Sequence, residues 1–118
     1  EVIIHLYEEL GIGLVNKLIG MFAFAIWDKK KEILFLARDR IGEKPLYYRH
    51  SKTNFYFSSE IKPIIAVDDR STNIADNTFA NFLGLDSIPA PYTAFTNIFL
   101  LPPASILKFE LNTISIFK

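Results

Sequence analysis

Hydrophobic residues near the start of the chain recur at the spacing of an α-helix. Between residues 2 and 18 they stand mostly three or four positions apart, with charged residues between them. This is the pattern of a helix with one apolar face, and we therefore predict an amphipathic helix over residues 2–18. Gly11 and Gly13 lie in its middle and are poor helix formers, so we expect a break into two pieces there.

The spacing of the hydrophobic residues changes after residue 20, where bulky and small apolar residues alternate. Residues 21–27 fit a short strand that is buried on both faces. A polar turn at 28–32 and a second apolar run at 33–37 complete a predicted β-hairpin. A strand of this composition presents an open apolar edge wherever its neighbours are lacking.

A second hairpin and a short helix are predicted in the middle of the chain. Residues 46–49 and 54–58 are the two strands of this hairpin. Ser59 is placed to cap a helix over residues 60–66. Pro63 falls in the first turn of that helix, where its missing N–H costs little.

The last part of the chain combines linkers, turns and strands. Asp76 is a candidate N-cap for a second short helix, with Phe79, Phe82 and Leu83 on one face. The order of a helix, antiparallel strands, short helices and further strands predicts an α+β fold. The remaining predicted segments are a polar linker at 68–73, a proline-containing loop at 87–91, a turn at 101–103, and two final strands at 104–111 and 113–117.

Composition and charge narrow the classes of function. Half of the 118 residues are hydrophobic and 22% are charged, which suits one folded domain and argues against disorder. Lysine plus arginine equals aspartate plus glutamate, so the chain lacks the basic excess that nucleic-acid binding normally requires. There is no cysteine, which excludes disulfides, thiolate metal sites and a cysteine nucleophile within these residues.

The chain shows no targeting or membrane segment. No apolar run reaches the length of a bilayer span, and the first residues lack the features of a signal peptide. We therefore expect no membrane partner and a cytoplasmic location. The chain does not begin with Met, so we also expect it to be an internal part of a larger protein.

Several blocks of sequence stand in an order that is typical of a single family. They are EVIIHLY at 1–7, GMFAFAIWD at 20–28, ARDRIGEKPLYY at 37–48, FSSEIK at 57–62, IPAP at 88–91 and LPPA at 101–104. Together they resemble the class II glutamine amidotransferase domain of glutamine-hydrolysing asparagine synthetases. The resemblance covers essentially the whole chain.

The resemblance implies a fold in which two antiparallel sheets are stacked between helix layers. This is the αββα sandwich of the N-terminal-nucleophile hydrolases, here expected without its N-terminal strands. Residues 1–111 would form the C-terminal part of the amidotransferase domain. Residues 112–118 would be its last strand, or the start of a linker to an ATP-using synthetase domain.

The chemistry implied by the resemblance starts at an N-terminal cysteine that attacks the side-chain amide of glutamine. The ammonia released there passes through a tunnel to the synthetase domain, which uses ATP and magnesium to convert aspartate to asparagine. In the family the cysteine and the glutamine-binding residues all lie upstream of the positions matched here. We therefore assign no catalytic, cofactor-binding or metal-binding residue to this chain, and expect it to be inactive alone. Glutamine and the synthetase domain are the expected partners of the complete protein, and a homodimer of that protein is left open.

Arg38 and Asp39, with Arg40 beside them, form the most chemically suggestive cluster. One hypothesis is that they shape the glutamine site or the ammonia tunnel. The other is that they belong to a salt-bridged loop that fixes the first hairpin to its neighbours. We favour the second, because charged clusters of this kind are often purely structural.

Met21 matches a position that faces the ammonia tunnel in relatives, and its alternative is an ordinary core methionine. Glu43 and Lys44 replace residues that are apolar in relatives. If they line the tunnel, the tunnel of this protein differs, whereas a solvent-facing position would carry no consequence. His5 and His50 lack ligands at metal-binding spacing and are expected at the surface.

A rival hypothesis belongs to a different class of protein. In it, the chain is a non-catalytic binding or regulatory module, or the remnant of a degraded gene without activity. The neighbouring coding sequence separates the two hypotheses. An upstream Met-Cys start would favour the amidotransferase, and a frameshift would favour the rival.

Overall fold

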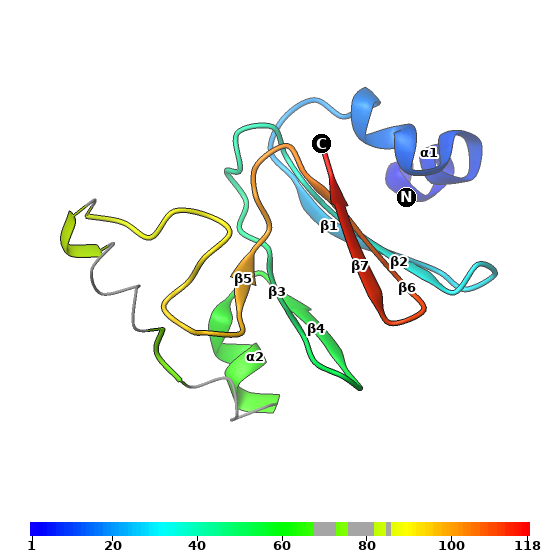
Figure 1. The fold of residues 1–118 in the computed structure, drawn as a ribbon. Coiled ribbons are helices and arrows are strands. Elements are labelled where there is room, and N and C mark those ends of the chain that lie inside the picture. The colour runs from blue at the N-terminus through cyan, green and yellow to red at the C-terminus, as the bar shows by residue number, and fades with distance from the viewer. Residues whose placement is uncertain (68–72, 76–81, 85) are drawn as a thin grey trace.

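Two antiparallel β-sheets form the centre of the molecule (Figure 1). The computed structural model describes residues 1–67, 73–75, 82–84 and 86–118. Within these residues the chain is α+β, as the sequence predicts. The prediction of a linker at 68–73 and of a helix starting at Asp76 falls largely outside the described residues.

The first sheet has four strands in the order β1-β2-β6-β7, and all neighbours are antiparallel. The predicted hairpin at residues 21–37 is confirmed, and so are the two final strands. Because β1 and β7 stand at the ends of this order, each leaves one edge without a strand in the described part of the chain. The strands are β1 (Ala23–Asp28), β2 (Ile33–Arg38), β6 (Ile106–Glu110) and β7 (Thr113–Phe117).

The second sheet has three strands in the order β4-β3-β5. β3 (Tyr47–His50) and β4 (Phe55–Ser58) form the second predicted hairpin. β5 (Phe99–Leu100) pairs with the other side of β3. The sequence did not predict β5, because two residues are too few to show a period.

The first helix is broken where the glycines predict it. α1 spans Val2–Leu10, and the 3-10 helix η1 spans Gly11–Lys17. Gly11 has a φ of 59°, in the left-handed region that glycine adopts without strain. The third helix, α2 (Ile61–Val67), lies where a helix was predicted. Its start differs in one detail, since the hydroxyl of Ser58, and not of Ser59, accepts a hydrogen bond from the Glu60 N–H at 3.2 Å.

The core lies between the two sheets. Leu36 and Leu107 of the first sheet pack against Tyr48 of the second, together with Leu46 and Leu101. On the other face of the first sheet, the ring of Tyr7 in α1 lies 6.0 Å from that of Phe35. α2 packs against β4 and β3, and Figure 1 shows α1 and α2 on opposite sides of the paired sheets.

One prediction about burial is wrong. The first strand was expected to be buried on both faces, but Ala25 and Trp27 of β1 are exposed. The second sheet covers the centre of the first and leaves these two residues of the edge strand uncovered. β2 is buried on both faces, because the second sheet packs against Leu36 on one face and Tyr7 of α1 packs against Phe35 on the other.

Candidate functional site

The loop that follows β2 is organised by a buried arginine. The guanidinium of Arg38 donates hydrogen bonds to the carbonyl oxygens of Lys44 at 2.8 Å, Leu101 at 2.6 Å and Gly42 at 2.5 Å. A guanidinium has five N–H donors in a fixed plane, so it can hold several carbonyls of separate segments in one geometry. Arg38 thereby ties the loop to the segment after β5.

Asp39, which is 1% exposed, accepts hydrogen bonds from the backbone of the same loop through its carboxylate. Its Oδ1 accepts the backbone N–H groups of Ile41 at 3.1 Å, Gly42 at 2.7 Å and Glu43 at 3.1 Å. Its Oδ2 accepts those of Lys44 at 3.2 Å and Phe22 at 3.3 Å. One carboxylate therefore fixes the loop and joins it to the residue before β1.

Burial and hydrogen bonding act on the acidity of Asp39 in opposite directions. Burial alone would raise the pKa of this carboxyl. Hydrogen bonds from the amides of residues 41–44 stabilise the charged form more strongly, and they lower the pKa to about 2. The charge of Asp39 is thus compensated by main-chain dipoles, and not by the neighbouring arginine side chain.

Gly42 allows this loop to close. It has a φ of 78°, and a Cβ at this position would lie 2.9 Å from Cγ of Pro103 and 3.1 Å from Cζ of Arg38. The loop backbone therefore sits directly against the Arg38 guanidinium. A side chain of any size would push these groups apart.

Met21 and the end of this loop border a hollow of about 400 Å³. Ala23, Lys44 and Pro45 are among the other residues that line it. Met21 is 62% exposed in this chain, and Glu43 is exposed as well. Among the residues singled out in the sequence, Arg38 and Asp39 therefore lie at the centre of one hydrogen-bonded loop. Met21 borders the adjoining hollow, and the Glu43 side chain faces solvent.

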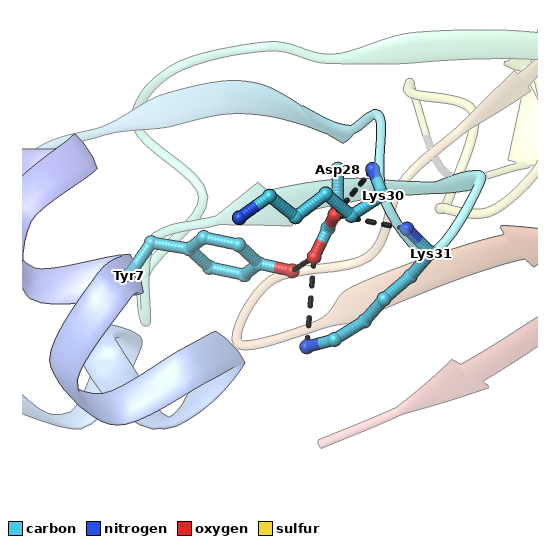
Figure 2. Close-up of polar contacts among 4 residues, drawn as sticks. All are labelled: Tyr7, Asp28, Lys30 and Lys31. Atoms are coloured by element: carbon cyan, nitrogen blue, oxygen red, sulfur yellow. Dashed lines mark hydrogen bonds and ion pairs between the residues drawn. The ribbon is translucent and has the colours of Figure 1, made fainter.

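A second polar cluster, which the sequence did not indicate, joins α1 to the end of β1 (Figure 2). The Tyr7 hydroxyl donates a hydrogen bond to Oδ2 of Asp28 at 2.9 Å, and Nζ of Lys31 lies 3.5 Å from the same oxygen. Oδ1 of Asp28 accepts the backbone N–H groups of Lys30 and Lys31. Twenty-one positions separate Tyr7 from Asp28, so no local spacing could have revealed the contact.

The contact between Tyr7 and Asp28 changes the acidity of both groups. Burial, followed by the hydrogen bond to Asp28 and its negative charge, raises the pKa of Tyr7 to about 12. The Tyr7 hydrogen bond, followed by the Lys31 amide, lowers the pKa of Asp28. A phenol with a raised pKa is a poor general base near neutral pH, so we interpret this cluster as a structural contact between helix and sheet.

In the part of the chain that the structure describes, neither histidine belongs to a group of three or more possible metal ligands. Nδ1 of His5 lies 3.4 Å from a carboxylate oxygen of Glu8, and Nε2 of His50 lies 2.9 Å from Oδ1 of Asn112. Among the described residues, no group of three or more His, Cys, Asp or Glu side chains could hold a metal ion. In the same residues, no helix is both long and apolar enough to cross a membrane.

Comparison with known proteins agrees with the sequence blocks and the fold. The family model described as a glutamine amidotransferase domain matches residues 1–118, so the chain belongs to this family. Within the family it is an amidotransferase domain of the asparagine synthetase type. This confirms the resemblance seen in the sequence.

The relatives that support this assignment carry the name of glutamine-hydrolysing asparagine synthetase. A Methanocaldococcus jannaschii protein of that name is 42% identical over all of this chain, and asparagine synthetase 3 of Bacillus subtilis is 38% identical over all of it. Asparagine synthetase 2 of Bacillus subtilis is 58% identical over 56% of the chain. The chain spans 23% and 19% of the length of the first two relatives, or about a fifth.

Proposed function

We propose that this chain is the scaffold part of the glutaminase domain of an asparagine synthetase-like enzyme. The observation that carries the proposal is the match to the amidotransferase family over all 118 residues, combined with the absence of any cysteine among them. In this proposal the complete enzyme hydrolyses glutamine and uses the ammonia, ATP and magnesium to form asparagine from aspartate. The nucleophile and the ATP site would be supplied by residues outside this chain.

The hydrogen-bonded loop supports a structural role for Arg38 and Asp39. The polar atoms of both side chains form hydrogen bonds with backbone groups of the same protein. Little hydrogen-bonding capacity is left for a substrate, so we propose that the two residues hold the wall next to Met21 and do not touch glutamine. In the complete domain, we propose that Met21 lines the path of ammonia, because a neutral molecule passes an apolar side chain without gaining a proton.

The resemblance also supports the sandwich architecture of the N-terminal-nucleophile hydrolases for the complete domain. The two stacked antiparallel sheets, with α1 on one side and α2 on the other, agree with that layer order. The comparisons do not favour the rival hypothesis of a non-catalytic module or the remnant of a degraded gene.

A chimera tests whether the chain can serve as this scaffold. The matching segment of Bacillus subtilis asparagine synthetase 3 would be replaced by residues 1–118, and asparagine formation would be measured with glutamine or with ammonium as nitrogen donor. We expect activity with both donors. Activity with ammonium but none with glutamine would show that the chain cannot support glutaminase chemistry, and the proposal would fail.

The isolated chain supplies the second test. Purified residues 1–118 should release no ammonia from glutamine above background, because the nucleophilic thiol is missing. Ammonia release from glutamine that co-purifies with the chain through successive chromatography steps would contradict the proposal that the nucleophile lies outside this chain.

A further inference from the structure

The turns of two hairpins meet at the end of the paired sheets that lies away from the Arg38 loop. Residues 51–54 join β3 to β4 in the second sheet, and Leu111 and Asn112 join β6 to β7 in the first. β6 begins beside the loop, where the Arg38 N–H donates to the Ser105 carbonyl at 3.0 Å, and it ends at the second turn. Figure 1 shows both hairpins pointing to the same side of the molecule.

The side chain of Asn112 connects the two turns. Its Nδ2 donates a hydrogen bond to the carbonyl oxygen of Lys52 at 2.9 Å, and its Oδ1 lies 2.9 Å from Nε2 of His50. A carboxamide has a donor at one end and an acceptor at the other. The carbonyl of Lys52 can only accept, so the NH₂ group must face Lys52 and the oxygen must face His50.

This direction fixes the position of the proton on His50. Because Oδ1 of Asn112 is an acceptor, Nε2 of His50 must be the donor. A neutral imidazole carries a single N–H, so the neutral ring is the Nε2–H tautomer. Two rings flank the imidazole, with that of Phe109 edge-on at 5.4 Å and that of Phe55 at 6.2 Å. These two rings stack on each other at 4.5 Å across the sheets, which restricts the imidazole to the orientation that reaches Asn112.

We propose that the hydrogen bonds of Asn112 with His50 and Lys52 form a clasp that holds the second sheet against the first. The clasp is a directed chain, in which His50 donates to Asn112 and Asn112 donates to the turn at 51–54. The Arg38 loop fixes one end of the sheet pair, and the clasp fixes the other. This conformational role is independent of the proposed function.

The backbone of the second turn agrees with such a role. Leu111 has a φ of 47° and Asn112 a φ of 60°, the two left-handed residues of a tight hairpin turn. Asparagine adopts this conformation readily, whereas leucine does so rarely and at a cost. The Leu111 side chain is 90% exposed, so packing returns little of that cost. A strained turn persists where its surroundings hold it, and the hydrogen bonds of Asn112 to the other sheet contribute to that hold.

A simpler role for Asn112 is to accommodate the turn, and two substitutions distinguish this role from the clasp. Asn112→Gly keeps a residue that adopts a positive φ without strain but removes the carboxamide, so it affects the 51–54 turn only if the clasp is real. Asn112→Asp keeps an oxygen facing His50 and loses the donor to Lys52. It should therefore release the Lys52 half of the clasp alone.

The first experiment determines the tautomer of His50 in the 118-residue chain by NMR of ¹⁵N-labelled histidine. The chain has two histidines, and His5→Gln assigns their signals. At mildly alkaline pH, where an unperturbed imidazole is neutral, we expect Nε2 protonated and Nδ1 unprotonated in wild type and in Asn112→Asp. Asn112→Gly should move both shifts toward the average of two exchanging tautomers. A proton on Nδ1 in wild type, or shifts that Asn112→Gly leaves unchanged, would overturn the proposal.

The second experiment measures amide hydrogen exchange by mass spectrometry, in the chain alone and in the chimera described above. Peptides that cover residues 51–54 include the Ser51 N–H, which donates to the Asn54 carbonyl at 2.8 Å. We expect Asn112→Gly to speed their exchange by about tenfold, as the loss of hydrogen bonds between the turns predicts. Asn112→Asp should also speed it.

Leu111→Gly is the matched control, because it puts the same residue into the same turn and leaves the Asn112 side chain in place. It should leave exchange at 51–54 unchanged. Equal acceleration by Leu111→Gly and Asn112→Gly would assign the effect to turn flexibility, and no acceleration by Asn112→Gly would show that the turns are held by other contacts. Either result would overturn the proposal. Neither experiment reads glutamine hydrolysis, so its failure leaves the proposed function untouched.

Discussion

The carboxylate of Asp39 accepts the backbone N–H of Gly42 at 2.7 Å, and the carbonyl of Gly42 in turn accepts a hydrogen bond from the Arg38 guanidinium. The peptide units that flank Gly42 are thus held between the two charged side chains that precede them in sequence. The charged groups of Arg38 and Asp39 are satisfied by hydrogen bonds to the backbone of the loop. This explains why two ionised groups can be buried side by side. The chemistry of the complete domain, as we propose it, comes from residues outside this chain, and the loop holds the wall next to Met21.

Replacing Asp39 by asparagine should destabilise the fold strongly. The amide has only one oxygen acceptor, and its NH₂ group would face backbone N–H donors that the carboxylate now satisfies. We expect a loss of about 3 kcal/mol in the free energy of unfolding, typical of a broken buried hydrogen-bond network. Urea denaturation followed by circular dichroism measures it. Glu43→Gln is the control, since it makes the same chemical change on an exposed side chain of the same loop, and an equal loss there would show that burial is not the cause.

Acid should remove the contribution of Asp39 in a defined range of pH. The pKa of this carboxyl is about 2 in the folded chain, below the value of about 3.9 for an unperturbed aspartate. Its stabilising contribution, about 2 kcal/mol, is therefore present above about pH 4 and is lost as the pH falls through about 2. Urea midpoints measured from neutral pH down to about 2 should show the wild-type chain approaching Asp39→Asn. A difference between the two chains that stays constant over this range would contradict the assignment.

The sequence predicts most of the strands and the helices α1, η1 and α2, because the spacing of their hydrophobic residues is a local pattern. The hairpins at 23–38 and 47–58 follow directly from apolar runs separated by polar turns. Burial of β1 could not be predicted in the same way, since it depends on where the second sheet ends and not on the residues of the strand. The hydrogen-bond partners of Arg38 and Asp39 could not be predicted from the sequence either. Their charged neighbours suggested salt bridges, whereas the actual acceptors and donors are backbone groups as distant as Leu101.

Replacing Gly42 by alanine should destabilise the loop that Arg38 and Asp39 hold. Gly42→Ala places a Cβ within 2.9 Å of Pro103 and forces a non-glycine residue to keep a φ of 78°. The left-handed backbone alone costs roughly 1–2 kcal/mol, and displacement of the Arg38 guanidinium adds to it, so we expect a loss of about 3 kcal/mol in unfolding free energy. The comparison is Gly13→Ala, where a Cβ meets nothing within 4 Å and the change should be small or stabilising, by less than about 1 kcal/mol. Similar effects of the two substitutions in urea denaturation would show that the contact with Pro103 and Arg38 is not needed.

Removing the Tyr7 hydroxyl should weaken the contact between α1 and the first sheet, and should do so in a pH-dependent way. The hydrogen bond to Asp28 joins a partly buried phenol to a carboxylate, so Tyr7→Phe should cost about 1 kcal/mol after allowance for solvent screening.

The pKa of Tyr7 is raised to about 12, compared with about 10 for a free tyrosine. Its contribution is therefore complete below about pH 10 and is lost as the pH rises toward 12, because the unfolded chain then releases the proton more readily than the folded one. Burial also raises the pKa of Tyr48, so the alkaline loss of stability must be compared between wild type and Tyr7→Phe, with the exposed Tyr92→Phe as control. We expect the wild-type chain and the control to lose more stability than Tyr7→Phe between about pH 9 and pH 11.5, and parallel curves for all three chains would refute the contact.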